Sequence, residues 1–400
     1  MTKSIILARR SASHLRNLLK LSFVAGGGML GLFILFTVGL RPIVSQSRSG
    51  IDPLNQYAKM EFISETPPLD ITLSFSYFLP LLTYHYIVPT WTFLGPSVEV
   101  RSFTVAGADT LYVGASDGVY RSQDSGRSWL WLSALSCVGP AMVVDPTTPA
   151  HVFAGTCFGP YESSGSGITW ESRKGDVGLF AVSALALNPR DPQMLIAGTN
   201  QFEYQSGNVY VTENGGLNWT SVLPQRTNAK VILIDTDDSR ILYVATADGK
   251  FLKTTNGGAN WIEIQSDLGG RIAESMAIDS TNHEVLYTAT NDGIFRSTNA
   301  GLNWTRLNTG TGNSCFTAIT VQSITPTIVY AAAKSESCSI VSGTAVIYRS
   351  VDGGDAWSKI QNSADLSRVF RLHIPEGNPY FLHVGTRSGV WKYGPITVKH

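Results

Sequence analysis

Six basic residues occupy positions from which their side chains could bind anionic groups together. They stand at or just before the first residues of short apolar segments, and they are Arg101, Arg226, Lys230, Arg271, Arg368 and Arg371. Guanidinium and ammonium groups that converge would bind a partner's carboxylates through charged hydrogen bonds. The alternative is a set of separate solvated cations, some paired with Glu99, Asp176 or Glu274. Which of these two interpretations is correct depends on the structural elements that position the six residues.

Residue patterns typical of catalysis are missing from the sequence. It contains no H-E-x-x-H zinc motif, no G-x-S-x-G elbow, no phosphate-binding loop and no dinucleotide fingerprint. The seven histidines are scattered, and no C-x-x-C spacing offers a structural zinc site. We therefore expect no cofactor and no metal, and we favour a binding function over catalysis.

The composition narrows the class of partner. The 30 basic and 30 acidic residues give a formal net charge of zero, so no global field attracts nucleic acid. The 38 glycines and the aromatic content of 10% suit many short strands joined by tight turns. An anionic partner would therefore need a local basic patch.

One pattern, Ser/Thr-x-Asp/Asn-x-Gly-x-x-Trp, recurs along the chain. This repeat identifies the structural elements that position the six basic residues. Five full copies cover residues 122–129, 212–219, 254–261, 297–304 and 350–357, and a degenerate copy at 163–170 has lost its acid. Their defining residues are Ser122, Asp124, Gly126 and Trp129, then Asn214 and Trp219, Asn256 and Trp261, Asn299 and Trp304, and Asp352 and Trp357. We expect these residues to be structural: the side-chain oxygens accept backbone N–H groups in a turn, the glycine takes a backbone conformation unfavourable for other residues, and the tryptophan packs.

The repeat length predicts a β-propeller. Its tryptophans lie 41 to 53 residues apart, the length of a four-stranded blade. Six motif copies close six blades, and residues 369–374, 380–385 and 390–393 supply three strands of a seventh. Residues 90–97 resemble an outer strand without a preceding motif, so they should complete the seventh blade and remove its free edge. We predict an all-β, seven-bladed propeller over residues 90–394, followed by a tail at 395–400.

These copies resemble the Asp-box (BNR) repeat, which occurs in sialidases, xyloglucanases, sortilin receptors and photosystem II stability/assembly factors. A single tethered seven-bladed propeller is most similar to the assembly factors, which are not catalytic and bind membrane-protein assembly intermediates. The resemblance therefore implies a protein-binding scaffold. A shared fold alone does not show that two proteins have the same function. The membrane anchor that we expect for this chain is a helix.

A carbohydrate-active propeller, either a glycoside hydrolase or a glycan-binding module, is the alternative. Sialidases carry an Arg-Ile-Pro-type motif before the first repeat and have six blades, whereas residues 42–100 contain no such motif. Xyloglucanases are normally two propellers long. Two carboxylates facing the channel at glycosidase separation would favour a hydrolase, and a basic mouth with few carboxylates would favour the scaffold.

The four cysteines predict two disulfides, Cys137–Cys157 and Cys315–Cys338. In each pair the first cysteine precedes an inner strand and the second follows the adjacent strand, whose ends an antiparallel ladder brings together. Both bridges should lie on the face opposite the Asp-box turns, beside two enlarged loops at residues 200–207 and 334–344. Enlarged loops usually mark the binding face of a repeat protein. Disulfides also imply an oxidising compartment.

The N-terminal residues predict a membrane anchor. Residues 21–40 contain no charged side chain and could span a bilayer as one helix. Residues 1–20 are basic without an acid, which favours a cytoplasmic N-terminus and an extracytoplasmic propeller at the cell membrane. Residues 41–89 form a linker that ends in an apolar, membrane-proximal segment. A cleaved signal peptide is the competing interpretation, although its apolar region is usually shorter.

Overall fold

The structure is a computed structural model of the chain, which divides into two compact units, Met1–Tyr84 and His85–His400. The second unit is described over residues 89–394, apart from residues 108, 134, 176–180, 201–206, 224, 265–267, 311–314, 323–326, 335–343, 361–365 and 375–380. In the first unit only short strands are described. They are β1 (Ser4–Ile5), β2 (Leu21–Gly26), β3 (Met29–Leu32), β4 (Pro42–Ile43) and β5 (Glu61–Phe62), with β1-β2-β3 in one sheet and β4-β5 in another.

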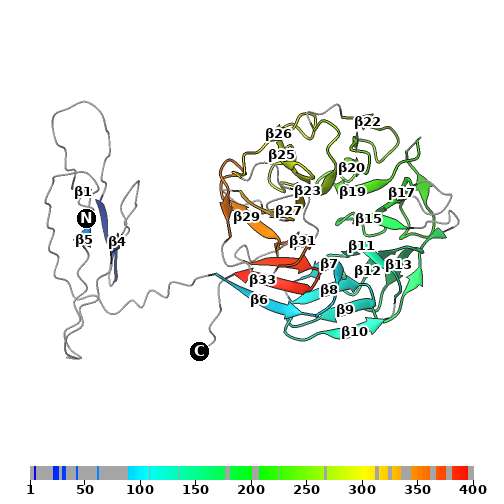
Figure 1. Cartoon of the computed structure of the whole chain (residues 1–400), viewed down its shortest axis with the longest axis horizontal. Helices are drawn as coiled ribbons and strands as arrows, with labels where there is room; N and C mark the ends of the chain where they lie inside the picture. The colour runs from blue at the N-terminus through cyan, green and yellow to red at the C-terminus, as the bar shows by residue number, and fades with distance from the viewer. Residues whose placement is uncertain are drawn as a thin grey trace. The chain divides into compact units, whose positions relative to one another are not determined.

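The second unit is a ring of seven four-stranded antiparallel sheets, which confirms the predicted seven-bladed propeller. Figure 1 looks onto this ring, with the first strand of each blade near the centre. Blades 1 to 7 begin with the inner strands β7 (Val100–Ala106), β11 (Val138–Val144), β15 (Val182–Leu187), β19 (Ala229–Ile234), β23 (Ala273–Ile278), β27 (Phe316–Gln322) and β31 (Val369–His373). Their second strands are β8 (Thr110–Ala115), β12 (Val152–Thr156), β16 (Leu195–Thr199), β20 (Leu242–Thr246), β24 (Leu286–Thr290), β28 (Ile328–Ala333) and β32 (Leu382–Thr386).

The third and outer strands follow in the same order. The third strands are β9 (Gly118–Ser122), β13 (Gly159–Ser163), β17 (Val209–Thr212), β21 (Phe251–Thr254), β25 (Gly293–Ser297), β29 (Val346–Ser350) and β33 (Gly389–Gly394). The outer strands are β10 (Leu130–Ser133), β14 (Glu171–Ser172), β18 (Thr220–Ser221), β22 (Ile262–Glu263), β26 (Thr305–Arg306) and β30 (Ser358–Lys359) in blades 1 to 6. In blade 7 the outer strand is β6 (Thr90–Gly95), which pairs with β33. The first strand of the propeller thus supplies the outer strand that the last repeat lacks.

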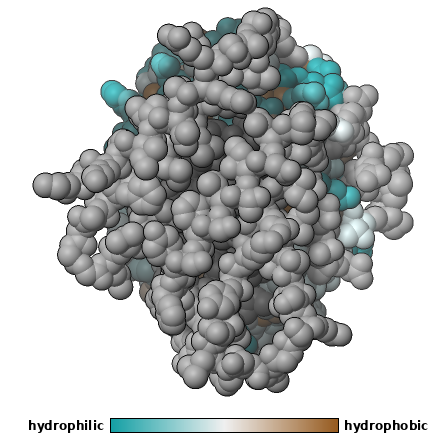
Figure 2. Space-filling view, turned by 90° about the vertical axis from the view of Figure 1, so that its left-hand side faces the viewer, coloured by the Kyte–Doolittle hydropathy of each residue, from teal (hydrophilic) through white to brown (hydrophobic). Residues whose placement is uncertain are grey.

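The hydrophobic core is divided among the seams between blades. Each of its seven clusters combines buried residues of two neighbouring blades, as where Val390 of blade 7 packs with Val100 and Phe103 of blade 1. The second strands are the most buried elements, and apolar side chains on both of their faces fill two seams at once. Seen from the side in Figure 2, the coloured surface is mostly hydrophilic, with only small hydrophobic areas. Packing between blades therefore closes the ring.

The repeat motifs form tight turns with the expected hydrogen bonds. In the first copy the Ser122 hydroxyl donates to Asp124 at 2.7 Å and accepts the Gly126 N–H at 2.8 Å. Asp124 accepts the Ser128 N–H at 2.9 Å, and hydrogen bonds from Ser128 and then Ser122 lower the pKa of Asp124 to about 2. Gly126 has φ +87° and lies against Leu94, so the turn excludes a side chain there.

Of the expected membrane helix at residues 21–40, residues 27–28 and 33–40 lie outside the described residues. The described residues of that range form the strands β2 and β3 rather than a helix. Across the described part of the chain, no helix is both long and apolar enough to cross a membrane.

Candidate functional site: the disulfide face

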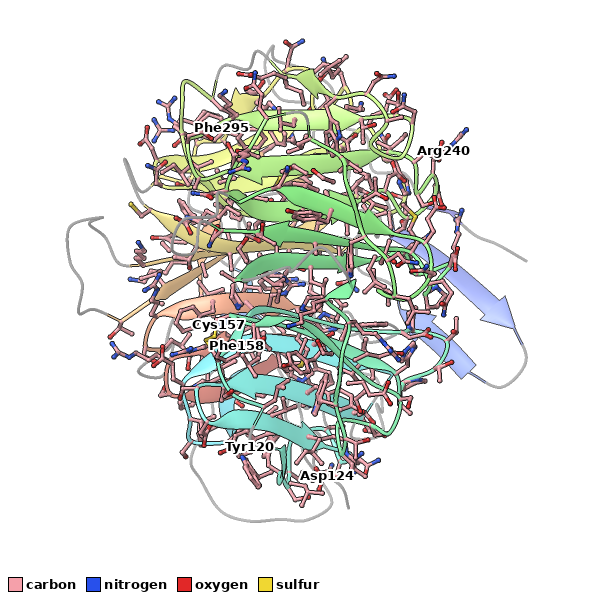
Figure 3. All side chains as sticks on the ribbon, turned by 90° about the vertical axis from the view of Figure 1, so that its right-hand side faces the viewer. Tyr120, Asp124, Cys157, Phe158, Arg240 and Phe295 are labelled. Carbon is pink, nitrogen blue, oxygen red and sulfur yellow. A yellow bond between two sulfur atoms is a disulfide. The ribbon has the colours of Figure 1, made fainter. Side chains whose placement is uncertain are left out.

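The loops of the propeller divide between two faces. Each repeat turn bonds the loop between the first two strands of its own blade, as where the Gly257 N–H donates to the Arg240 carbonyl at 2.9 Å. We call the face formed by these loops the repeat-turn face. The opposite face carries the loops between second and third strands and the chain that leads into each inner strand, and we call it the disulfide face. Figure 3 shows Cys157 and Phe158 on one side of the molecule, with Asp124 and Arg240 on the other.

A disulfide bond joins the two kinds of loop on this face. Cys137 and Cys157 are bonded, with their Cα atoms 5.7 Å apart, which confirms the first predicted bridge. Cys315 is also disulfide-bonded, but Cys338 lies outside the described residues, so the second pairing stays a prediction. Lys334, rather than Cys338, occupies the place of Cys157, because its N–H donates to the Cys315 carbonyl at 2.8 Å. Most of both enlarged loops also falls outside the description.

Each inner strand contains a β-bulge near its first residue, where it leaves the disulfide face. The ladder skips Arg101 between Val100 and Ser102, and it skips one residue at the same place in five further blades. These residues are Ser183, Lys230, Glu274, Thr317 and Phe370. Bulges re-aim side chains, so Arg101 and Lys230 occupy equivalent positions on the ring, and Arg371 comes one residue later.

Two of the six predicted cations are neutralised by neighbouring carboxylates. Lys230 of blade 4 forms an ion pair with Glu274 of blade 5 at 2.6 Å. This agrees with the alternative interpretation, in which Glu274 pairs with one of the six cations. Arg271 binds Asp292 at 2.8 Å and donates to the Leu268 carbonyl at 2.9 Å. Asp292 also contacts Arg306 at 3.2 Å. Both carboxylates, Glu274 and Asp292, are thus paired with cations. These contacts brace blades 4 and 5.

The other four predicted cations have no ion pair with the described residues. They are Arg101, Arg226, Arg368 and Arg371. Arg226 is exposed before β19 in blade 4, so it lies apart from the rest. Arg368 stacks over the ring of Phe370 with its guanidinium carbon 5.1 Å from the ring centroid, and it is exposed. Three of the unpaired cations therefore belong to the neighbouring blades 7 and 1.

Arg387 adds a cation that sequence reasoning missed. It lies in the exposed turn between β32 and β33, and its N–H donates to the Arg368 carbonyl at 3.0 Å. Three other blades place an aspartate in the corresponding turn: Asp117, Asp248 and Asp292. In blade 7 this turn contains Arg387 and Ser388 and no acid. The replacement of an acid by a base in this turn is the sequence signal that could have identified Arg387.

Arg371 lies on β31 among groups that carry no charge at neutral pH. Its side chain retains exposed surface, but the surrounding strands displace bulk water, and this desolvation lowers the pKa of its guanidinium. An arginine remains protonated under such conditions. Burial, followed by the charges of His383 and Arg371, lowers the pKa of His373 to about 3. Arg371 is therefore the charged group at this point of the ring.

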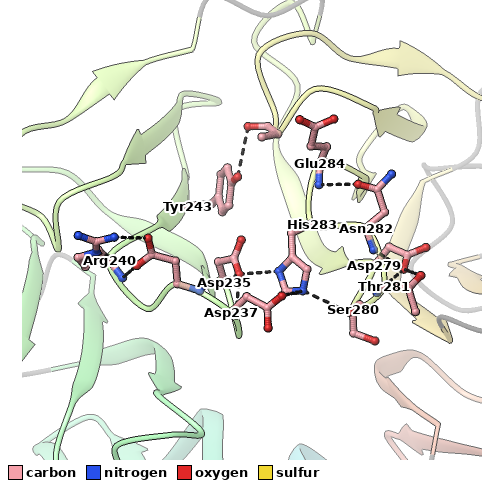
Figure 4. A network of polar contacts seen from close by, with 12 residues as sticks. Asp235, Asp237, Arg240, Tyr243, Asp279, Ser280, Thr281, Asn282, His283 and Glu284 are labelled. Atoms are coloured by element: carbon pink, nitrogen blue, oxygen red, sulfur yellow. Dashed lines mark hydrogen bonds and ion pairs between the residues drawn. The ribbon is translucent and has the colours of Figure 1, made fainter.

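On the repeat-turn face, polar side chains pair with one another. His283 of blade 5 contacts Asp235 at 2.5 Å and Asp237 at 3.1 Å, both from blade 4. Asp237 in turn binds Arg190 of blade 3 at 2.6 Å. Figure 4 shows the part of this network around His283, with Arg240 nearby. Arg240 pairs with Asp238 at 2.7 Å. This network links blades 3, 4 and 5.

Within the described residues, no group of three or more His, Cys, Asp or Glu side chains is arranged to hold a metal ion. The arrangement on the disulfide face is one of unpaired arginines beside aromatic rings, which suits carboxylates and other anions.

No family model matches the sequence, and no curated protein matches it. Solved structures share the fold at low identity. A GH74 xyloglucanase from Xanthomonas campestris superposes with a TM-score of 0.62 at 16% identity, over 76% of this chain and 53% of that chain. A structure described as YCF48 bound to D1 peptide gives 0.59 at 14% identity, over 80% and 100%. YCF48 from Cyanidioschyzon merolae gives 0.55 at 17% identity, over 76% and 98%.

These matches establish the propeller fold and differ in coverage. The chain spans about half the length of the xyloglucanase but the whole or nearly the whole length of the two YCF48 chains. The likeness to both groups agrees with the two resemblances drawn from the motif.

Proposed function

We propose that this protein is a non-catalytic, membrane-anchored propeller that binds another membrane or exported protein through its disulfide face, as an assembly factor or scaffold. The observation that carries the proposal is the set of unpaired cations on blades 7 and 1: Arg101, Arg368, Arg371 and Arg387. Uncompensated arginines retain their donors for a partner's carboxylates, whereas Lys230 and Arg271 have already used theirs.

Two further observations support a protein partner. A propeller of the same fold and similar extent is described as bound to a peptide. In addition, Glu274 and Asp292, the carboxylates that face Lys230 and Arg271, are held in ion pairs rather than left as a pair of free acids. A retaining or inverting glycosidase needs two carboxyl groups available at a defined separation.

The proposal also includes a cellular location, with the N-terminus in the cytoplasm and the propeller outside it. Residues 21–40 are apolar enough to act as a membrane anchor, and the basic residues before them favour a cytoplasmic N-terminus. The Cys137–Cys157 disulfide supports an oxidising, extracytoplasmic site for the propeller. The anchor would hold the propeller at the membrane that contains its partners.

Co-purification with charge-reversed baits tests this function. The full chain is tagged and extracted gently from membranes, and the recovered proteins are identified by mass spectrometry. One bait carries Arg368→Glu and Arg371→Glu. The matched control carries Arg190→Glu and Arg240→Glu on the opposite face, where both side chains are exposed.

We expect one stoichiometric protein partner with the wild type and the control, and its loss from the Arg368/Arg371 bait. An unchanged melting temperature of that bait would show that the ring is intact. Equal recovery with all three baits, or recovery of none, contradicts binding at this face. Hydrolase assays and glycan arrays would then be the next measurements.

A further inference from the structure

Two of the repeat turns contain the sequence Asn-Trp-Thr at the same place in the motif. These segments are residues 218–220 of blade 3 and residues 303–305 of blade 5. An asparagine followed two positions later by serine or threonine is the acceptor sequence for N-linked glycosylation, unless the middle residue is proline. Such a short sequence also occurs by chance, so its structural setting decides whether a sugar could be attached there.

The asparagine and the threonine of each segment face the solvent. All four of these residues are exposed: Asn218, Thr220, Asn303 and Thr305. The tryptophan between them is buried, since Trp219 is 6% exposed and Trp304 is 2% exposed. The threonines begin β18 and β26, which are the outermost strands of their sheets. A sugar on either asparagine would therefore extend into solvent from the rim of the ring without displacing the core.

The side-chain amides of both asparagines are free to react. The backbone N–H of Asn218 donates to the side-chain oxygen of Asn214 at 3.0 Å, and that of Asn303 donates to Asn299 at 2.9 Å. The two side-chain amides themselves have no hydrogen-bond partner in the part of the chain that the structure describes. The amide nitrogen of each asparagine is thus both exposed and unengaged.

The fold does not require an asparagine side chain at this position. Ala356 occupies the same place in the repeat turn of blade 6, and its backbone N–H donates to Asp352 at 2.9 Å. The turn therefore uses only the backbone of this residue. The amides of Asn218 and Asn303 are available for a role outside the turn.

Blade 4 has the same turn without the acceptor sequence. Asn260 is exposed, and its backbone N–H donates to Asn256 at 2.9 Å. Ile262 stands two positions after Asn260, is 53% exposed and begins the outer strand β22. This turn shares the hydrogen bond and the exposure of the other two but lacks the threonine hydroxyl, so it is a matched control within the same chain.

We propose that Asn218 and Asn303 are N-glycosylation sites. In this reaction the side-chain amide nitrogen attacks the anomeric carbon of a sugar that is carried on a lipid pyrophosphate. A bond forms between the nitrogen and that carbon, and the bond from the carbon to the phosphate oxygen breaks. The pyrophosphate leaves with the bonding electrons, and the amide loses one proton. The inference rests on the extracytoplasmic location in the proposed function, because N-linked sugars are attached to exported proteins.

The position of both sites is compatible with the proposed binding function. The repeat turns belong to the face opposite the disulfide face, so sugars at these sites would leave the expected partner surface uncovered. Each acceptor also follows an exposed leucine, with Leu217 58% exposed and Leu302 50% exposed. A sugar attached to the next residue would cover part of this apolar surface.

Peptide mapping of the full chain, purified from its own membranes, tests the proposal. Mass spectrometry detects an attached glycan as added mass that fragments into sugar ions. We expect a glycan on the peptides that contain Asn218 and Asn303, and none on the peptide that contains Asn260. Thr220→Val should abolish the glycan at Asn218 alone, whereas Ile262→Thr should create one at Asn260. Both changes are at exposed positions, so the melting temperature should stay unchanged.

Unmodified Asn218 and Asn303 would overturn the proposal, and so would equal modification of Asn260 in the wild type. Protease added to intact cells separates this inference from the proposed location. A propeller that is cut from outside but carries no glycan contradicts glycosylation and leaves the location standing. A propeller that is neither cut nor modified contradicts both.

Discussion

At the scale of single residues, the repeat turns show how one hydroxyl organises five residues of backbone. Ser122 is 1% exposed and accepts the buried Gly126 N–H, while its own proton goes to Asp124. The serine or threonine of every other copy accepts the corresponding glycine N–H at 2.7 to 3.1 Å. The residue is retained for its oxygen atom, which explains why serine and threonine interchange.

Ser122→Ala should therefore destabilise the propeller. The change leaves the buried Gly126 N–H without an acceptor, at a cost of about 1–3 kcal/mol in the free energy of unfolding. Ser122→Thr is the control, since Thr212 and Thr254 make the same bond at 3.0 and 3.1 Å. Urea denaturation of the three proteins provides the comparison. A stability of Ser122→Ala equal to that of the wild type would contradict this role of the hydroxyl.

The histidine pair of blade 7 leads to a prediction about pH. Burial, followed by the charge of Lys392, lowers the pKa of His383 to about 4, and His373 opposite it is lowered to about 3. The unfolded chain takes up these protons from about pH 6.5 downwards, but the folded chain does not. Stability is therefore complete above pH 6.5 and is lost as the pH falls towards 4, by up to about 1.4 kcal/mol per pH unit for each imidazole.

His383→Phe should reduce that loss. The other six blades place Tyr, Phe or Ile at this position, and neither ring nitrogen of His383 has a hydrogen-bond partner. We expect a smaller difference in unfolding free energy between pH 7.5 and pH 5 than in the wild type, measured by chemical denaturation. An unchanged difference would show that the acid sensitivity originates elsewhere.

The residue scale also shows the limits of sequence reasoning about the site. The sequence pattern at the starts of the inner strands identified Arg101, Arg368 and Arg371, which have no ion pair with the described residues. It could not distinguish them from Lys230 and Arg271, which have one. That distinction depends on Glu274 and Asp292, which come from a neighbouring blade or from a turn across the sheet. Arg387 was missed because it belongs to a turn rather than to the start of an inner strand.

At the scale of elements, the ring is closed by strands from both ends of the propeller. Trp391 pairs with Phe93 and Tyr393 pairs with Trp91 in the ladder between β33 and β6, and the rings of each pair are about 5 Å apart. Period-two patterns and the motif spacing predict these strands, because every blade repeats one local arrangement. The bulges on the inner strands were not predicted, since a bulge leaves no period in the sequence.

The disulfide on blade 2 makes an element-scale prediction. Cys137 and Cys157 are 20 residues apart, and a closed loop of this size restricts the unfolded chain. Replacing both with serine should lower the free energy of unfolding by about 3 kcal/mol. Denaturation of the oxidised wild type and the double variant measures the difference. A reduced wild type that unfolds like the oxidised one would contradict the prediction.

At the scale of the whole molecule, the two faces of the propeller differ in how they use charge. The repeat-turn face pairs its acids, histidines and arginines across three blades. The disulfide face leaves Arg368, Arg371 and Arg387 of blade 7 and Arg101 of blade 1 without ion pairs in the described residues. A protein with zero net charge can thus present a local basic surface, and this surface is where we expect a partner.

Site-specific photo-cross-linking in intact membranes tests this claim most directly. One cross-linking residue replaces Ser388, which is exposed beside Arg387, and another replaces Leu217, which is 58% exposed on a repeat turn. The account predicts a discrete adduct with one protein from position 388, its loss when Arg368 and Arg371 are changed to Glu, and none from position 217. An adduct only from position 217, or one from position 388 that survives the arginine changes, would contradict it.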